Sequence, residues 1–312
     1  MENLLLAFRV VLPLFLTMAV GYFLRRRGMV DEPLLQKLNS LVFKVFLPML
    51  LFENIYSSDV ESLLNPKVII TAVVIVLVLF VALCLIVPLI EKDGKKRGVI
   101  VQGIFRSNYI IFGMPIVAGV FGDKGIGVVS ITSAFVIPMF NVLSVAALEA
   151  FSHGAVDKKK IAKGIAKNPL IIASLLGVAA LFSGITIPEA INKVFVDFGK
   201  VATPLGLMSL GGFFKFEDTR HCIKQLVIIV VGRLILCPLI FLPIVIAMGF
   251  RGVELMALAT MLGAPIAVSS FIMAQQQGAD SELAGQAVAY TTLLSVVTMF
   301  FIVFGLKQSG LI

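Results

Sequence analysis

Two Gly-x-Pro triplets stand inside separate apolar stretches of the chain, Gly113 to Pro115 (GMP) and Gly263 to Pro265 (GAP). Glycine ends a helix at little cost, and proline begins one because its missing N–H would have no partner there. Each triplet favours a broken helix, although a proline kink in a continuous helix is the alternative for a single triplet. Two broken helices would turn unpaired N–H groups and positive dipole ends into the interior, where a carboxylate or another anion can bind.

Polar side chains accompany both triplets. Asn108 precedes Pro115 by seven positions, about two helical turns, so the two residues share a helix face. The Asn108 amide can donate to a carboxylate or make an interhelical hydrogen bond, which is the usual role of polar residues in membrane bundles. Ser269 and Ser270 follow Pro265 closely, and each hydroxyl can donate to a ligand or back to its own helix. We expect one serine to take each role.

Ionisable residues inside apolar stretches are candidates for function, because burying a charge in lipid is costly. Lys44 lies near the middle of its stretch, where it can neutralise a substrate carboxylate or pair with an acid. Arg106 lies closer to an end and can attract an anion or snorkel to the interface. Arg233 is expected to hold a carbonyl or carboxylate, whereas Glu53 and Glu149 lie near ends that water can reach. Since no Asp lies deep in a stretch, the coupling ion, a proton or sodium, stays unassigned.

The composition requires a bilayer around these residues. The 312 residues are 59% hydrophobic and 14% charged, whereas soluble domains carry roughly a quarter charged residues. The net charge is +8, but the basic residues gather in short connections between apolar runs and no nucleic-acid module is recognisable. We therefore expect a lipid partner and no nucleic acid. The three cysteines have no CxxC spacing, so neither a metal nor a cofactor is expected.

About 20 mostly apolar residues cross a bilayer as a helix, in which the backbone pairs with itself. The first such run lacks a basic leader and a cleavage site, so we expect it to be retained as a span. Ten runs satisfy the requirement and predict an all-α polytopic membrane protein, with spans at 4–24, 34–55, 67–90, 98–121, 125–150, 165–184, 189–213, 223–248, 253–275 and 283–306.

The hydrophilic connection 153–164 divides these spans into two repeats of five, residues 1–152 and 165–312. Because five is odd, a second repeat of the same fold must enter the membrane from the opposite face, which is a recurrent plan of secondary transporters. The two triplets then fall in the fourth and ninth spans, which we expect to cross. The distribution of Lys and Arg predicts an outside N-terminus and a cytoplasmic 153–164.

A series of different short motifs is spread along nearly the whole chain. They are Leu38-Asn39 through Pro48, Asn108 to Pro115 (NYIIFGMP), Asn168-Pro169, Met208 to Gly211 (MSLG), Arg233 with Pro238, and Ala264-Pro265 followed by Ser269, Ser270 and Phe271. Together they resemble the auxin efflux carrier family, which includes plant PIN-type carriers and bacterial malate or malonate permease-like proteins.

The resemblance implies a ten-helix inverted repeat, crossed fourth and ninth helices, a scaffold, a transport domain and a carboxylate substrate. It also marks Asn39, Pro48 and Ser209 as accessory residues and implies that the second span ends in a proline break. Lys44 departs from the family pattern, which usually has an uncharged residue there. The short central loop favours a compact carrier of a bacterial plasma membrane over a plant auxin carrier.

The resulting hypothesis is a secondary transporter that moves a small organic anion, such as a dicarboxylate or an auxin-like weak acid, by alternating access. The substrate would lie between Asn108, the helix ends at Pro115 and Pro265, and one of the two serines. The first, second, sixth and seventh spans would form the scaffold. An ion-coupled carrier of the bile-acid/sodium or sodium–proton type, a channel and a sensor remain alternatives, and a homodimer is left open. An enzyme is disfavoured because no catalytic group lies at depth.

Overall fold

The computed structural model describes residues 2–57, 66–152, 164, 166–214 and 222–312. Every regular element in these ranges is helical, so the predicted all-α class is confirmed. Among the described residues, seven helices are long and apolar enough to cross a membrane, or eight if one bent pair counts as a span, and Pro169–Ser183 is a shorter apolar helix. The count of ten spans therefore stays a prediction. The connection 153–164 lies outside the described residues, except for Gly164.

The elements fall on either side of that connection. The first half contains α1 (Glu2–Arg26), α2 (Glu32–Leu41), the π-helical turn η1 (Val42–Phe46), α3 (Leu47–Tyr56), α4 (Pro66–Ile90), α5 (Gly94–Phe105), α6 (Tyr109–Phe121) and α7 (Asp123–Ser152). The second half contains α9 (Pro169–Ser183), α10 (Glu189–Phe213), α12 (Ile223–Val231), the π-helical turn η2 (Gly232–Leu236), α13 (Cys237–Ala247), α14 (Gly252–Gly263), α15 (Val268–Gln276) and α16 (Ser281–Gln308).

Short polar residues fix several helix starts. Asp31, Asn168 and Asp280 each accept a backbone N–H of the first turn of α2, α9 and α16, at 2.9 Å in each case. Such caps satisfy donors that have no partner within the helix. The Asn168-Pro169 motif is thus a helix start, with proline at the first helical position, where its missing N–H costs nothing.

The two π-helical turns each lie just before a proline, Pro48 after η1 and Pro238 after η2. Proline lacks the N–H that would continue the helical ladder, and a π turn is one way in which a helix accommodates the missing bond. The run Glu32–Tyr56 continues through Pro48 as a single candidate span. The proline break expected in the second span is therefore absent, and a π turn takes its place.

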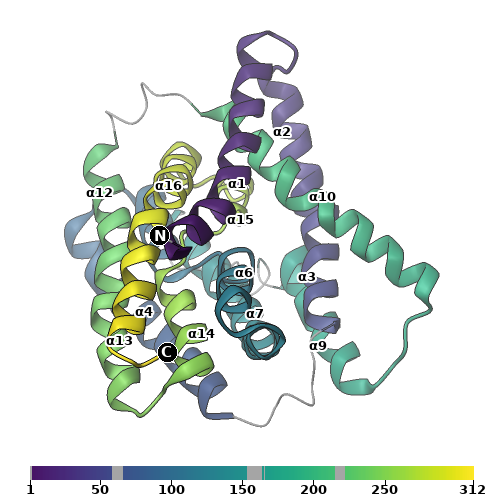
Figure 1. The fold of residues 1–312 in the computed structure, drawn as a ribbon. Coiled ribbons are helices and arrows are strands. Elements are labelled where there is room, and N and C mark those ends of the chain that lie inside the picture. The colour runs from purple at the N-terminus through teal and green to yellow at the C-terminus, as the bar shows by residue number, and fades with distance from the viewer. Residues whose placement is uncertain (1, 58–65, 153–163, 165, 215–221) are drawn as a thin grey trace.

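The helices form two groups (Figure 1). We call α1, α2, α3, α9 and α10 the scaffold group, because α10 packs on α1, α2 and α3 while α3 packs on α9. We call α4 to α7 and α12 to α16 the core group, in which α7 packs on α4, α5 and α6 while α14 packs on α6, α13 and α16. The groups meet where α1 contacts α16, α7 contacts α9 and α10 contacts α15.

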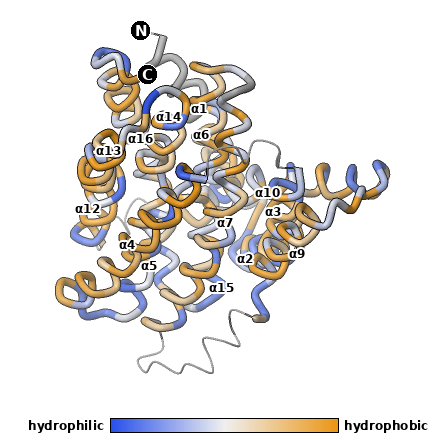
Figure 2. Tube along the Cα trace, turned by 90° about the horizontal axis from the view of Figure 1, so that it is seen from below, coloured by the Kyte–Doolittle hydropathy of each residue, from blue (hydrophilic) through white to orange (hydrophobic). Residues whose placement is uncertain are grey.

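The outside of the molecule is apolar over much of its surface. Large side chains such as Leu89, Leu239 and Leu85 are more than half exposed. Figure 2 shows hydrophobic residues along the helices and hydrophilic ones at several helix ends and turns. A soluble protein rarely exposes apolar patches of this extent, whereas lipid solvates them. The exterior therefore agrees with a multi-pass membrane protein.

Candidate anion site at two touching helix breaks

The predicted fourth and ninth spans are both interrupted. Residues 106–108 separate α5 from α6, and residues 264–267 separate α14 from α15, which are bent by 41° relative to each other. The two interruptions touch, because the Asn108 backbone N–H donates to the Pro265 carbonyl oxygen at 2.8 Å. Segments that lie some 150 residues apart in the sequence thus meet inside the core group, as expected for the fourth and ninth spans.

The position predicted for the first interruption is wrong. Gly113 and Pro115 lie inside α6, and the break falls several residues earlier. A Cβ on Gly113 would lie 2.9 Å from the Tyr109 ring and 3.2 Å from Thr260 Oγ1. Glycine at this position therefore lets α6 approach α14 closely, and Pro115 stays within the helix, which is the alternative noted for a single triplet. At the second triplet, α14 ends at Gly263 as predicted.

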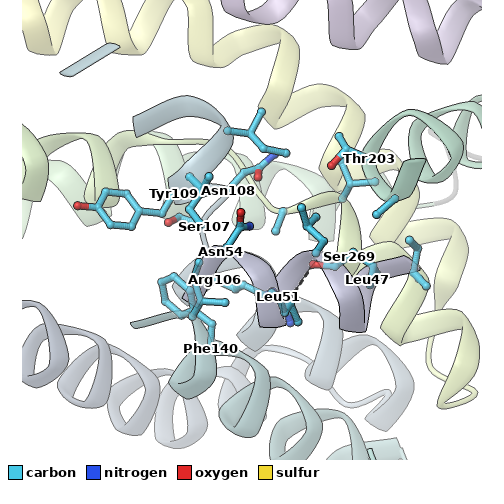
Figure 3. A pocket seen from close by; sticks show the side chains of 18 residues that line it. Leu47, Leu51, Asn54, Arg106, Ser107, Asn108, Tyr109, Phe140, Thr203 and Ser269 are labelled. Atoms are coloured by element: carbon cyan, nitrogen blue, oxygen red, sulfur yellow. Dashed lines mark hydrogen bonds between the residues drawn. The ribbon is translucent and has the colours of Figure 1, made fainter. Parts of the chain in front are cut away.

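A cavity of about 160 Å³ lies beside the touching breaks, between the core and scaffold groups (Figure 3). A cavity of ~150 Å³ in another protein admits benzene, so this one can hold an acid of a few carbon atoms. Its main lining residues are Arg106, Ser107, Asn108 and Tyr109 at the first break, Ala267, Val268 and Ser269 at the second, Phe140 of α7, Leu47, Leu51 and Asn54 of α3, and Ala202 and Thr203 of α10.

Two helix N-termini open at this cavity. α6 begins at Tyr109 and α15 at Val268, and both residues are among those that line it. Neither helix start has a side-chain cap: the preceding residues, Asn108 and Ala267, make no capping hydrogen bond. First-turn N–H groups have no partner within their own helix, and they carry the positive end of its dipole. An anion in the cavity can supply the missing acceptors.

Arg106 adds a full positive charge to the same wall. Its guanidinium is buried and donates from Nη2 to Ser269 Oγ at 2.7 Å and to Asn141 Oδ1 at 2.8 Å, and from Nη1 to Met273 Sδ at 2.7 Å. All three partners are neutral, and within the described part of the chain no acid forms a salt bridge with Arg106. A buried charge is costly without a counter-charge, so an anionic ligand would stabilise this arrangement.

The predicted ligand-binding residues divide into two sets. Asn108 and Ser269 line the cavity, and Pro265 touches Asn108 through its carbonyl. Ser270 is buried and is not among the lining residues, and its hydroxyl has no hydrogen-bond partner, so it does not donate back to its own helix as one of the two serines is expected to do. Lys44 is exposed on η1 and does not line the cavity, so its predicted contact with substrate stays a prediction.

Most of the accessory candidates also lie away from the cavity: Asn39, Pro48, Glu149, Ser209 and Arg233. Asn39 is buried and donates from Nδ2 to Gln275 Oε1, which joins α2 to α15. Ser209 Oγ donates to the Leu35 carbonyl at 3.5 Å within the scaffold group. Glu149 is half-buried near the end of α7. These side chains thus have positions in the packing of the helices rather than in the cavity wall.

Several polar residues of the site were not singled out from the sequence. Ser107, Asn54 and Thr203 line the cavity, and Asn141 orients the Arg106 guanidinium. Their signal in the sequence is weak: each is an ordinary polar residue in an apolar run, where an interhelical hydrogen bond is the common role. Proximity to Arg106, which only the fold provides, distinguishes them.

Comparison with known proteins places the chain in a family. A family model described as membrane transport protein matches residues 6–303. A transporter of Methanothermobacter thermautotrophicus that is named uncharacterized is 25% identical over 303 residues, which is 93% of this chain and 95% of that protein. A Rhizobium meliloti protein named, provisionally, a malonate transporter is 24% identical over 312 residues, 96% of each chain. The chain therefore belongs to the membrane transport protein family, the auxin efflux carrier family that its motifs resemble.

Proposed function

We propose that this membrane transporter is a secondary carrier that moves a small carboxylate, malonate or a similar short acid, by alternating access. One observation carries the proposal: the buried Arg106 and two uncapped helix starts surround one cavity. Guanidinium groups and helix N-termini both favour carboxylate oxygens, the guanidinium by paired hydrogen bonds and the helix ends by free N–H groups.

The ligand would be held from both sides of the cavity. One carboxylate would lie against Arg106 and the helix starts of the core group, and the rest of the acid would face Asn54 and Thr203 of the scaffold group. A ligand bound between two groups of helices changes its exposure when one group moves against the other. The substrate assigned to the Rhizobium meliloti relative makes malonate the first acid to test.

The pairing of helices supports an inverted repeat of ten spans. If the second half repeats the first, α9 corresponds to α1 and α10 to α2–α3, so the contact of α1 with α10 matches that of α3 with α9, and both contacts are present. Likewise, α5 packs on α7 in the first half, and α14 and α15 pack on α16 in the second. The orientation can be tested by labelling a cysteine introduced at Lys159 in a cysteine-free background, with an impermeant maleimide that should reach it from the cytoplasmic side only.

The test of function is uptake of radiolabelled malonate into proteoliposomes. Arg106→Gln should lower the ratio kcat/KM by about tenfold or more, the effect of losing one hydrogen bond to a charged group. Arg97→Gln is the matched control, because Arg97 lies on the same helix, α5, but donates to the Glu91 carbonyl rather than lining the cavity. Arg97→Gln should transport at nearly the wild-type rate.

Two results would contradict the proposal. Wild-type uptake by folded Arg106→Gln would remove the anion site, and absence of wild-type uptake across a panel of mono- and dicarboxylates would remove the carrier. Repeating the assay with and without sodium and a pH gradient identifies the coupling ion. Saturation of uptake at high malonate separates a carrier from a channel, because a carrier binds its substrate in each cycle.

A further inference from the structure

We propose that Arg233 is a positioning residue that holds the carbonyl ends of both broken helices, so that the two helix starts at the cavity move as one unit. The inference rests on the proposed function only for its effect on ligand binding. The structural part, a single side chain that joins two helix ends from the two halves of the chain, stands on the contacts alone.

The guanidinium of Arg233 contacts both interruptions. Toward the end of α14, Nε donates to the Ala264 carbonyl at 2.8 Å and Nη2 to the Met261 carbonyl at 2.5 Å. Toward the end of α5, Nη1 donates to the Ile104 carbonyl at 3.0 Å and to the Phe105 carbonyl at 3.4 Å. Arg233 is 1% exposed and is the bulkiest of the fully buried side chains among the described residues.

These carbonyls need a donor. The last C=O groups of a helix have no N–H partner in that helix, and the interior of a bilayer offers no water to replace it. The two helix ends also carry the negative ends of their dipoles, which favour a cation nearby. In the described ranges no acid forms a salt bridge with Arg233, so the carbonyls are the groups that compensate its charge.

The sequence around Arg233 brings the guanidinium within reach. Arg233 lies in the π-helical turn η2, next to Gly232. A Cβ on Gly232 would lie 2.8 Å from Ile104 Cδ1, and a Cβ on Gly103 would lie 2.9 Å from Ile229 Cγ2. The two glycines therefore allow α12 and η2 to approach the end of α5 closely. A bulkier residue at either position would push the guanidinium away from the carbonyls.

The geometry connects Arg233 to the cavity without contact between them. After the end of α5 the chain continues through Arg106 to Asn108, and after the end of α14 it continues through Pro265. These two connecting segments are joined by the hydrogen bond from the Asn108 N–H to the Pro265 carbonyl. Arg233 thus fixes the relative position of the two helix starts that follow. A lysine has a compact ammonium without the planar fork of a guanidinium, so it is expected to serve the two ends less well.

Hydrogen–deuterium exchange of the full-length protein in detergent tests the bridge. In Arg233→Gln, amide exchange should become faster by about tenfold or more in both segments, 100–110 and 260–270, since hydrogen bonds to a charged group are lost at each. Arg251→Gln is the matched control, because Arg251 Nη1 also donates to carbonyls at a helix end, but at the end of α13: Ile246 in its last turn at 2.8 Å and Phe250 just after it at 2.6 Å. It should leave both segments as in the wild type.

Unchanged exchange in Arg233→Gln, or faster exchange in only one of the two segments, would overturn the bridge. If Arg233→Gln does not fold, Arg233→Lys replaces it, with a smaller increase in exchange expected in both segments and wild-type exchange as the overturning result.

The malonate KM of Arg233→Gln should rise by about tenfold while that of Arg251→Gln stays unchanged, and a wild-type KM would refute the effect on the site. Exchange needs no substrate, so a wild type that takes up none of the mono- and dicarboxylates would refute the proposed function and leave this test intact.

Discussion

Gly211 of α10 is predicted to be among the least replaceable residues of the scaffold group. A Cβ at this position would lie 1.9 Å from the carbonyl oxygen of Met18 in α1, and 2.7 Å from its carbonyl carbon. The contact is repeated in the opposite direction, since a Cβ on Gly21 of α1 would lie 1.9 Å from the carbonyl oxygen of Met208 in α10. Small residues commonly let membrane helices approach in this way.

The substitution Gly211→Ala adds one methyl group against a backbone atom that cannot rotate aside. Overpacking costs about 1–3 kcal/mol, and contact with backbone places this site at the upper end. Alanine favours a helix over glycine by about 1 kcal/mol, so the net loss of stability is about 2 kcal/mol. By the usual relation between stability and melting, the apparent melting temperature in detergent should fall by about 4 °C.

The assay is thermal unfolding of both variants and the wild type at one heating rate, because unfolding of a membrane protein is often irreversible. Gly305→Ala is the matched control: it also lies in a long apolar helix, α16, and its Cβ would meet nothing within 4 Å. This control should melt at or slightly above the wild-type temperature. If Gly211→Ala and Gly305→Ala have the same melting temperature, then α1 and α10 are not packed as closely as the structure has them.

Three further results are expected. Asn39→Ala removes the hydrogen bond between α2 and α15, so amide exchange in both helices should become faster while α4 is unaffected. Lys44→Gln should keep the initial rate of malonate uptake within about twofold of the wild type, since this exposed side chain does not line the cavity. Glu91, in the connection after α4, has a lowered pKa. Partial burial raises this pKa, but hydrogen bonds from the Asp93 amide and the Gln225 side chain stabilise the ionised carboxylate and together outweigh the effect of burial. The ionised form is thus favoured in the folded state, so the stability advantage of the wild type over Glu91→Gln should be present at pH 7 and shrink as the pH falls below 4.5, the ordinary pKa, in melting experiments.

The sequence predicts the fold class because the signal is local. Long apolar runs must be helical in lipid, and the observed α4 and α16 follow the predicted runs 67–90 and 283–306 to within a few residues. The second break was also predictable, since Gly263 ends α14 where glycine is expected to end a helix. These features depend on a residue and its immediate neighbours, with little contribution from distant contacts.

The first break was misplaced because its cause is not local. The carbonyls of Ile104 and Phe105 can leave the helical ladder at that point because Arg233, more than a hundred residues away, donates to them. No pattern around Arg106 reveals that partner. Pro115 carries the stronger local signal for a break, yet a proline in a membrane helix can be accommodated without one.

The contrast between the cationic candidates follows from the same limit. Lys44 and Arg106 look alike in the sequence, since each is a basic residue within an apolar run. Lys44, however, lies in a π-helical turn, where side chains point in other directions than they would in a regular α-helix. Its side chain is exposed, whereas that of Arg106 is buried at the break. Which face of a helix is buried depends on its neighbours, and a single apolar run does not reveal them.

The two buried arginines at the crossing differ in what compensates their charge, and this difference supports the two roles proposed for them. Arg233 donates to four backbone carbonyls at two helix ends, so its charge is already matched by the negative ends of two dipoles. Arg106 donates to a hydroxyl, an amide oxygen and a thioether, beside two uncapped helix starts that are themselves positive. A ligand that supplies negative charge would therefore gain from binding beside Arg106 and nothing from approaching Arg233, which is why the cavity, rather than the crossing as a whole, is the place to look for the substrate.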